Sequence, residues 1–341
     1  MSQLSSKAIS LVCVDKRRAT DDVIVITLAH QQKQVITFNP GQYITLSATI
    51  KGKTYDRCYT ISSCPEQSEC IEIIVKRVSQ GAMSNWLLDQ LGVGDIIQAS
   101  EPCGQFHLAR SNKPKLLLLS AGVGVTPLLS MLRHIAKSHL AYEVIFHHSA
   151  QTSKDIIAAH ELNALGDQYP HFTISYNLSR GRPDSDSNQY SGHICEEMLQ
   201  RICSDIPQRD VFVCGPNSYM ERVQQILTKQ GLPSNQYFQE DFEIAPLAAV
   251  RDSNNTYTID FCHSNSRTEI SSGETVLDAA QRLGIDLDTS CSSGICGSCT
   301  SYIIEGNIAA PQAQAIDEED IGSGEFLPCC SYPLSNLKVD L

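Results

Sequence analysis

Short runs in which hydrophobic and polar residues alternate fill the first third of the chain. The runs with the period and composition of β-strands are VIVITLAH, QYITLSATI, RCYTISS and CIEIIVKRV. Turn-forming residues separate them, as in FNPGQY, and one helix is expected at Ala82–Leu91. Many short strands with turns between them are typical of a small antiparallel β-barrel. We expect such a barrel over residues 4–110.

The pattern changes in the middle third, where continuous apolar runs alternate with helical periodicity. The runs KLLLLSAG, EVIFHHS and DVFVCG have the composition of buried strands, and a stretch with the spacing of a helix follows each of them. Strands that alternate with helices form parallel sheets covered on both faces. The pattern therefore predicts an α/β parallel-sheet domain over residues 111–243. Within it, the polar segment Ser179–Gly192 is expected to be a loop.

The last quarter of the chain is a third segment with its own composition. Residues 244–255 are predicted to be a linker, and residues 256–341 contain a hairpin pattern, a helical pattern and a final short strand. This mixture predicts an α+β domain. Residues 252–341 hold 14 acidic and 3 basic residues, a net charge of −11, and the whole chain has a net charge of −12. The acidity therefore belongs almost entirely to this domain.

Composition and charge narrow the class of protein. The acidic surface disfavours nucleic acid as a partner and favours a basic protein surface. The most apolar stretch, Leu116–Leu132, is interrupted by glycines and a proline and is too short to span a bilayer. The first ten residues lack the apolar core of a secretion signal. We expect no membrane span and a cytoplasmic location. The reducing cytosol disfavours disulfides among the 14 cysteines, so we expect the clustered cysteines to serve metal or redox chemistry and the lone ones to be small buried hydrophobic residues.

Three cysteines stand close together near residue 295. Cys291, Cys296 and Cys299 have x4 and x2 spacing, as in a plant-type [2Fe–2S] loop that takes its fourth thiolate from a distant residue. Structural zinc sites use two short-spaced pairs, so iron and sulfide are favoured and zinc is the alternative. Cys329 and its neighbour Cys330 are both candidates for the fourth ligand. The segment resembles the plant-type ferredoxin domain, a β-grasp fold whose last cysteine stands four residues before a proline, and this resemblance assigns Cys329.

The segment RCYTISS, Arg57–Ser63, resembles the R-x-Y-[ST]-x-S signature of the ferredoxin-reductase flavoproteins. The resemblance implies a flavin site, and the residue types suit one. Arg57 offers a fixed pair of donors to a phosphate. Tyr59 can lay its ring against the isoalloxazine, and the Thr60 hydroxyl can hydrogen-bond the reactive flavin nitrogen. Ser62 completes the signature.

A second anion site is expected at the start of the predicted helix, in QGAMS. Backbone N–H groups at a helix N-terminus and one hydroxyl are suited to a pyrophosphate. In the family, this segment and the signature together indicate a flavin nucleotide, and the version here resembles the FAD branch rather than the FMN branch. The residues concerned are Gly81, Ala82, Met83 and Ser84.

The segment SAGVGVTP, which joins an apolar strand to a helix, is expected to bind a nicotinamide dinucleotide. Gly122 and Gly124 allow the backbone to approach a pyrophosphate. Pro127 suits the first helical turn, because its missing N–H is not needed there. Thr126 can contact the nicotinamide or its ribose. The form G-x-G-x-T-P resembles the reductase family.

A second nicotinamide segment is VFVCGPNSYM, in which Cys214 ends a buried strand. Gly215 and Pro216 then turn the chain into a helix. In the family, this cysteine lies beside the nicotinamide carbon that donates the hydride. The tripeptide EDF, Glu240–Phe242, resembles the family's acid–aromatic element beside the flavin, with Phe242 as the aromatic residue.

The choice between NADH and NADPH stays open at the level of individual residues. No acidic residue stands immediately at the end of EVIFHHS to bind a ribose 2′-hydroxyl. Arg180 and Arg182 can meet a 2′-phosphate, and they are equally suited to a solvated loop. The overall likeness favours NADH.

The three segments, in this order, resemble ferredoxin-reductase-type flavoproteins with a C-terminal plant-type ferredoxin domain. The group includes the NADH oxidoreductases of hybrid cluster proteins and the reductases of phenylacetyl-CoA epoxidase and of ring-hydroxylating oxygenases. The resemblance implies hydride transfer from NADH or NADPH to FAD, with Thr60 and Cys214 at the reacting centre. Single electrons then pass through a 2Fe–2S cluster to a redox protein that docks at the acidic face, where Ile316–Asp320 is expected to contribute.

The expected acceptor is a hybrid cluster protein, and an oxygenase or epoxidase component is the alternative. Two hypotheses of a different class remain. One is a redox-sensing iron–sulfur flavoprotein, and the other is a zinc-stabilised binding module with a degenerate reductase body.

Overall fold

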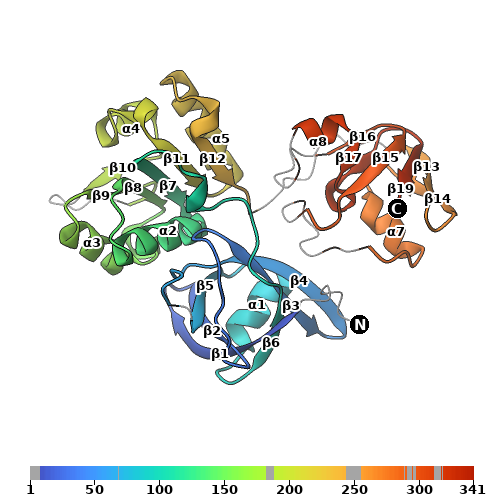
Figure 1. Cartoon of the computed structure of the whole chain (residues 1–341), viewed down its shortest axis with the longest axis horizontal. Helices are drawn as coiled ribbons and strands as arrows, with labels where there is room; N and C mark the ends of the chain where they lie inside the picture. The colour runs from blue at the N-terminus through green and yellow to red at the C-terminus, as the bar shows by residue number, and fades with distance from the viewer. Residues whose placement is uncertain are drawn as a thin grey trace. The chain divides into compact units, whose positions relative to one another are not determined.

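The computed structural model divides into two compact units, Lys7–Phe242 and Glu243–Leu341 with the first six residues. It describes residues 8–67, 69–181, 188–242, 255–287, 289, 294, 297–310, 316 and 318–341. In Figure 1 the first unit runs from blue to yellow and the second is orange to red. The predicted linker, residues 244–255, lies outside the described residues except for Asn255.

The N-terminal part of the first unit is a six-stranded antiparallel sheet in the order β4-β3-β6-β1-β2-β5. A bridge between Ile61 and Ile73 joins the segment after β4 to β5, so the two edges of the sheet meet around one core. Ile26, Ile44 and Leu46 are fully buried there. The predicted antiparallel barrel is confirmed. Its strands are β1 (Ile9–Arg18), β2 (Val23–His30), β3 (Tyr43–Ile50), β4 (Lys53–Thr60), β5 (Cys70–Lys76) and β6 (Ile96–Ala99).

Helix α1 (Ala82–Asp89) begins at the predicted residue and ends two residues before Leu91. Met83 and Leu87 point into the barrel core, which holds the helix against the sheet. Because α1 is anchored by these apolar contacts, its N-terminus has a fixed position on the barrel.

The second part of the first unit is a six-stranded parallel sheet in the order β10-β9-β8-β7-β11-β12. Helices α2 and α3 pack on one face, and α4 and α5 pack on the other. The predicted α/β domain is confirmed. Its strands are β7 (Lys115–Ala121), β8 (Glu143–Ala150), β9 (Phe172–Leu178), β10 (Gln189–Ser191), β11 (Asp210–Cys214) and β12 (Tyr237–Glu240). Its helices are α2 (Val125–Lys137), α3 (Ala159–Gln168), α4 (Glu196–Ile202) and α5 (Asn217–Lys229).

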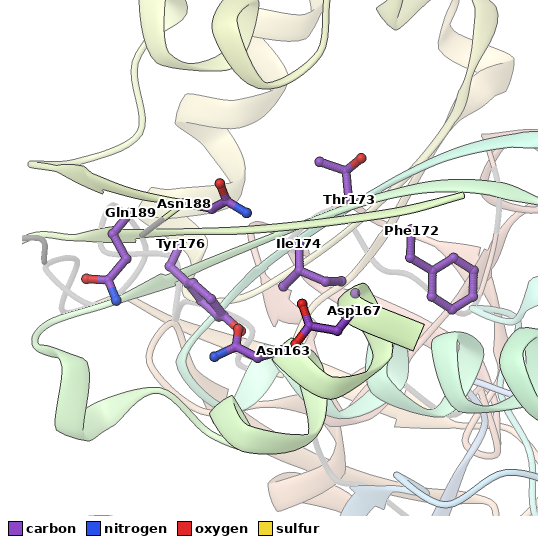
Figure 2. A pocket seen from close by; sticks show the side chains of 9 residues that line it. Asn163, Asp167, Phe172, Thr173, Ile174, Tyr176, Asn188 and Gln189 are labelled. Carbon is purple, nitrogen blue, oxygen red and sulfur yellow. The ribbon is translucent and has the colours of Figure 1, made fainter. Parts of the chain in front are cut away.

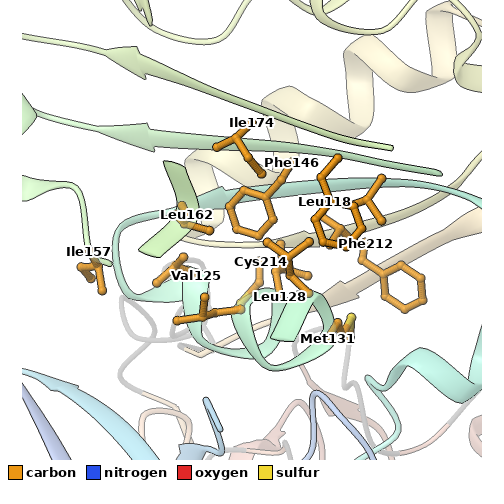
Figure 3. Close-up of a cluster of buried hydrophobic side chains, with 14 of the residues drawn as sticks. Leu118, Val125, Leu128, Met131, Phe146, Ile157, Leu162, Ile174, Phe212 and Cys214 are labelled. Atoms are coloured by element: carbon orange, nitrogen blue, oxygen red, sulfur yellow. The ribbon is translucent and has the colours of Figure 1, made fainter. Parts of the chain in front are cut away.

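Helix α2 is held to the sheet by a continuous apolar core (Figure 3). Leu128 and Met131 of α2 are fully buried, as are Phe146 and Phe212 of the sheet. Burial of a large apolar side chain contributes about 1.5–3 kcal/mol. Cys214 lies in the same cluster, so the carboxyl end of β11 and the start of α2 share one packed region.

The segment Ser179–Gly192, predicted to be a loop, contains the short strand β10 at Gln189–Ser191. It pairs in parallel with Tyr176–Leu178 of β9. The loop prediction is therefore wrong for these three residues. Strand pairing has satisfied the backbone of a polar segment that carries no hydrophobic pattern of its own.

A surface pocket of about 550 Å³ lies between α3 and the strands β9 and β10 (Figure 2). Inside it the Tyr176 hydroxyl donates to Asn163 Oδ1 at 2.8 Å. None of the lining residues has a predicted cofactor role. The pocket is therefore separate from the residues that the sequence singles out.

The second unit is built on a five-stranded mixed sheet in the order β14-β13-β19-β15-β17, with a small β16-β18 ladder beside it. Its α+β character is confirmed. No helix in the described parts of either unit is long and apolar enough to cross a bilayer. The strands are β13 (Thr256–Phe261), β14 (Ser266–Ser271), β15 (Ser301–Glu305), β16 (Ile308–Ala309), β17 (Glu325–Phe326), β18 (Tyr332–Pro333) and β19 (Leu337–Asp340), and the helices are α7 (Val276–Arg282) and α8 (Glu318–Gly322).

Candidate functional site

The flavin signature lies at the end of β4 and the residues that follow it. Arg57 is exposed, and its Nη1 donates to the carbonyl of Asp56 at 2.7 Å. Tyr59 is half-buried, and burial raises the pKa of its hydroxyl above the usual range. Ser62 is fully buried and donates to the carbonyl of Glu72 at 3.2 Å. The signature thus combines an exposed cation and a partly covered ring with a serine that is bonded into the barrel.

The N-terminus of α1 has no side-chain cap. Its N-cap residue, Gly81, makes no side-chain hydrogen bond, and the Ser84 hydroxyl accepts from the N–H of Val78 at 3.2 Å. A Cβ on Gly81 would lie 2.7 Å from Ser84 Oγ, so the turn requires glycine. The first N–H groups of α1, at Ala82 and Met83, therefore donate no hydrogen bond to an N-cap side chain, which suits an anion.

The predicted dinucleotide loop is a single tight turn, η2 (Gly122–Gly124), between β7 and α2. Gly122 has a φ of +55°, which favours glycine. A Cβ on Gly124 would lie 2.3 Å from the carbonyl oxygen of Cys214. The two predicted nicotinamide segments therefore touch, and they touch only because Gly124 lacks a side chain.

The remaining residues of this loop are buried at the start of α2. Thr126 is 2% exposed, and its hydroxyl donates to the carbonyl of Val123 at 2.9 Å. Pro127 is also buried. On the other side, a Cβ on Gly215 would lie 3.0 Å from Ala121 Cβ, and Pro216 is the N-cap of α5. These contacts give the loop a fixed shape.

The flavin signature and the nicotinamide segments converge at Glu240. Cys214 is fully buried, and its partner in the β11–β12 ladder is Glu240. The Thr60 hydroxyl donates to Glu240 Oε2 at 3.3 Å. Burial raises the pKa of Glu240 to about 8, against the lowering effect of Thr60. The carboxyl group is therefore largely protonated at neutral pH, and Glu240 links the two segments through its side chain to Thr60 and through strand pairing to Cys214.

Glu240 lies within the predicted EDF element, but no separate role was predicted for it. No sequence signal marks Glu240, because the other three residues of β12 are half-buried and Glu240 alone is buried, so its need for a partner becomes visible only in the fold. The partner, Thr60, is 180 residues away in the sequence, so local patterns do not reveal the pair. Phe242, the aromatic residue of EDF, is half-buried and packs against the same core as α2.

Two buried histidines lie on β8, which pairs with β7. His148 Nδ1 is 2.8 Å from Ser120 Oγ, at the end of β7. His147 makes hydrogen bonds of 2.8 Å to Ser175 and 2.9 Å to Asn177. Burial lowers the pKa of His147 to about 4 and that of His148 to about 3. Both side chains are therefore neutral at physiological pH and are part of the folded core.

In the second unit, two of the predicted cluster ligands come together. The sulfur atoms of Cys299 and Cys329 are 3.3 Å apart and buried. The N–H of Gly294 donates to Cys329 Sγ at 3.1 Å, whereas Cys330 Sγ donates to the carbonyl of Leu327 at 3.6 Å. Adjacent thiol groups with a backbone N–H aimed at sulfur fit an iron–sulfur cluster. Cys291 and Cys296 lie outside the described residues.

Comparison with known families divides the chain into three matched regions. Residues 10–108 match the oxidoreductase FAD-binding domain, residues 118–225 the oxidoreductase NAD-binding domain, and residues 260–334 the 2Fe–2S iron–sulfur cluster binding domain. The three matches have the order predicted from the sequence.

Curated relatives align with almost the whole chain. The glycine betaine monooxygenase reductase subunit of Chromohalobacter salexigens is 33% identical, over 96% of this chain and 94% of its own. The stachydrine N-demethylase reductase subunit of Rhizobium meliloti is 30% identical, over 98% of this chain and 97% of its own. NADH oxidoreductase HCR of Escherichia coli is 29% identical, over 88% of each chain.

Among solved structures, phthalate dioxygenase reductase has a TM-score of 0.72 and 22% identity, with complete coverage of both chains. At this identity the likeness concerns the fold.

Proposed function

The chain belongs to the NAD(P)H-dependent electron-transfer reductases that carry FAD and a 2Fe–2S cluster, and from this premise we propose that it supplies an oxygenase component with electrons from NADH in the cytoplasm. The observation that carries the proposal is the alignment, at 30–33% identity over 96–98% of the chain, with reductase subunits of a monooxygenase and a demethylase. The predicted cofactors are confirmed by the three domain families. The zinc-stabilised and non-enzymatic alternatives are therefore set aside.

A hybrid cluster protein, the acceptor expected first from the sequence, becomes the second candidate. It is supported by the 29% identity to NADH oxidoreductase HCR, over 88% of the chain. That identity and coverage are lower than those of the oxygenase reductases. The comparison thus favours the alternative over the first expectation.

Bound FAD would supply the chemistry that links the donor to the cluster, because a flavin can take up a hydride and release electrons one at a time. We propose that Arg57 and the N-terminus of α1 bind the FAD phosphates. The exposed guanidinium and the uncapped N–H groups support this role. Tyr59 is proposed to cover the isoalloxazine, and Phe242 is proposed to stand beside it. Along α1, the residues proposed to line the pyrophosphate are Gly81, Ala82, Met83 and Ser84.

The nicotinamide dinucleotide is proposed to bind along η2 and the start of α2. Gly122 and Gly124 would admit the pyrophosphate, and the close approach of Gly124 to Cys214 supports this arrangement. Thr126 and Pro127 shape the start of the helix. Gly215 and Pro216 form the opposite side of the same loop region.

Thr60 and Cys214 are proposed as the residues next to the reacting atoms. The hydrogen bond between Thr60 and Glu240 gives the Thr60 hydroxyl a fixed direction. Because Glu240 is largely protonated at neutral pH, it brings no negative charge toward a hydride donor. This neutrality suits a site through which a hydride passes.

The cluster is proposed to be held by Cys291, Cys296, Cys299 and Cys329. The close approach of the Cys299 and Cys329 sulfurs and the Gly294 N–H support Cys329 over Cys330. The Cys330 thiol is instead directed to a backbone carbonyl.

The acceptor is proposed to dock on the acidic surface of the ferredoxin unit. On this unit, Tyr302 and Ile321 are exposed at 46% and 50%, and the Tyr302 hydroxyl donates to Glu325 at 2.7 Å. Exposed apolar side chains among acidic residues are typical of weak electron-transfer interfaces. Within the predicted run Ile316–Asp320, Asp317 lies outside the described residues.

Neutralising the four acidic residues 317–320 tests this surface. We expect the KM for the acceptor to rise and its salt dependence to weaken. Glu269→Gln, on an exposed position of β14, is the matched control and should leave both unchanged. An unaltered KM and salt dependence in the four-residue variant would reject the surface.

The acceptor itself is tested by reconstitution. The purified reductase is mixed with NADH and with either the oxygenase component or the hybrid cluster protein from its own cells. We expect NADH-dependent product formation by the oxygenase at a rate well above that of hybrid cluster protein reduction. The opposite ranking would overturn the proposal and favour the second candidate. A parallel assay with NADPH tests the donor, and we expect the higher kcat/KM for NADH.

A further inference from the structure

An arginine on α2 connects the nicotinamide domain to the flavin barrel. The Arg133 side chain is 13% exposed. Its Nη1 donates at 2.8 Å to the carbonyl oxygen of Ser62 and at 2.8 Å to Glu72 Oε2, both on the barrel. Its Nε and Nη2 donate at 2.6 and 2.7 Å to the two carboxylate oxygens of Glu161 on α3. One guanidinium therefore joins α2 to the barrel on one side and to α3 on the other.

The barrel anchor of Arg133 is the end of the flavin signature. Ser62 lies two residues after Thr60, and its N–H donates to the carbonyl of Glu72 at 2.8 Å. The next residue, Ser63, accepts from the Glu72 N–H at 3.0 Å through its hydroxyl. The hydroxyl of Ser130, also on α2, donates to the carbonyl of Ser63 at 2.6 Å. Two consecutive carbonyl groups of the signature are thus held by one helix.

The other end of α2 is the dinucleotide loop. The helix starts at Val125, directly after Gly124, and is 13 residues long. At 1.5 Å per residue, Thr126 lies about 10 Å along the helix axis from Arg133. Because an α-helix packed on a sheet is stiff, the Arg133 contacts fix the distance from the loop to the signature strand.

We propose that Arg133 is a positioning residue for hydride transfer, because its bonds to Ser62 and Glu72 set the spacing between the Gly122–Thr126 loop and Thr60. The inference rests on the proposed roles of that loop and of Thr60. Reacting atoms must approach to about 3–3.5 Å, and a misplacement of about 1 Å costs on the order of 100-fold in rate. The planar guanidinium suits the task, because it reaches both carboxylates and the carbonyl at the same time.

The test is the anaerobic reduction of bound flavin by NADH, followed in a stopped-flow spectrometer. This measurement separates the limiting rate of hydride transfer from the dissociation constant for NADH. For Arg133→Met we expect the limiting rate to fall about 10- to 100-fold, with a small change in the dissociation constant. Arg133→Lys keeps the positive charge but loses the planar set of N–H donors. Its limiting rate should lie between those of Arg133→Met and the wild type.

Arg209→Met is the matched control. Arg209 is 3% exposed and donates to Asp205 at 2.6 Å and to the carbonyl of Leu116 at 3.2 Å. These contacts, with that to Glu143, lie at the amino ends of β7 and β8 within the nicotinamide domain. We expect this variant to unfold at a lower temperature and to keep the wild-type limiting rate.

A loss of thermal stability in both arginine variants with no change in either limiting rate would overturn the proposal. An effect of Arg133→Met on the dissociation constant alone would also overturn it. Where Arg133→Met fails to fold, Glu72→Gln keeps the arginine and weakens its barrel contact, and it should slow flavin reduction by several-fold. The proposed function is tested by a different measurement, electron delivery from the wild-type reductase to the oxygenase component. The failure of one proposal can therefore be told from the failure of the other.

Discussion

In the Lys7–Phe242 unit, the residues of the candidate site come from distant parts of the chain, with 180 positions between Thr60 and its partner Glu240. In the ferredoxin unit, the predicted ligands come from one loop and one further cysteine, and Cys299 and Cys329 are 30 positions apart. The charges differ as well, because residues 252–341 have a net charge of −11 and the remainder has −1.

The difference shows that the two sites depend on different features of the chain. The flavin–nicotinamide site needs two packed domains at a fixed spacing, held by buried polar contacts such as that between Thr60 and Glu240. The cluster site needs a loop of suitable spacing and a surface that attracts an acceptor. A substitution that disables the site of one unit should therefore leave the cofactor of the other unit in place.

Substitution of Cys329 should have the largest effect, and it should affect one unit. In Cys329→Ser the cluster is expected to be lost, and acceptor reduction to fall to background. Flavin content and the reduction of ferricyanide by NADH should remain, because they need the first unit alone. Iron and labile sulfide assays measure the loss.

Cys330→Ser is the matched control for that substitution. A serine hydroxyl can keep the contact of residue 330 with the carbonyl of Leu327, so the cluster should be retained. A cluster that survives Cys329→Ser and is lost in Cys330→Ser would contradict the ligand assignment.

A second prediction concerns Gly124 in the first unit. In Gly124→Ala the new Cβ would meet the carbonyl oxygen of Cys214 at 2.3 Å, and the backbone must shift. We expect flavin reduction by NADH to slow by about 100-fold, with iron content unchanged. Gly273→Ala in the ferredoxin unit, where no atom lies within 4 Å of the new Cβ, should behave as wild type. Equal activity of the two variants would show that the loop tolerates displacement.

A third prediction uses pH. The folded-state pKa of His148 is about 3, below its ordinary value of 6.5. The unfolded chain therefore binds more protons below pH 6.5, and the stability that neutral His148 contributes is lost as the pH falls. For a pKa of about 3 in the folded state and 6.5 in the unfolded state, this loss of stability is about 2 kcal/mol between pH 7 and 5.

Glu240, with its raised pKa of about 8, titrates in the opposite sense: it destabilises the folded state increasingly as the pH rises above the ordinary carboxyl value. The wild-type pH profile thus contains contributions of both signs, because His147, with a pKa of about 4, titrates in the same sense as His148. A variant isolates the contribution of His148. His148→Phe should change its free energy of unfolding relative to wild type by about 2 kcal/mol between pH 7 and 5, as measured by urea unfolding. A constant difference over this range would contradict the buried, neutral state of His148.

The smallest expected effect concerns a helix cap in the ferredoxin unit. Thr275 caps α7, with Thr275 Oγ1 accepting from the N–H of Asp278 at 3.1 Å. Thr275→Ala should lower the stability of that unit by about 1 kcal/mol. The unfolding transition of the Lys7–Phe242 unit, monitored through the release of flavin, should stay at its wild-type position. A shift in both transitions would show that the two units unfold together.

The sequence was informative where a site is local. The Cys-x4-Cys-x2-Cys spacing, the flavin signature and the G-x-G-x-T-P segment each lie within at most nine consecutive residues, so their chemistry is visible in the pattern. The barrel and the parallel sheet were predictable for a similar reason, because strand and helix periodicity are local properties.

The contacts that join the domains were not predictable from those patterns. Arg133 has the sequence context of an ordinary exposed helical arginine, and its partners Ser62, Glu72 and Glu161 become visible only when the domains are packed. The strand β10 was missed because pairing with β9, rather than hydrophobic alternation, stabilises it. Long-range contacts decide such cases, and a single sequence does not record them.

Anaerobic titration with NADH, with optical absorption and electron paramagnetic resonance recorded on the same samples, follows the electrons from the flavin to the cluster. We expect added NADH to bleach the flavin and to produce the resonance of a reduced 2Fe–2S cluster. In Cys329→Ser we expect bleaching of the flavin without that resonance. A wild-type protein whose flavin is reduced while its intact cluster stays oxidised would contradict the proposed path of the electrons.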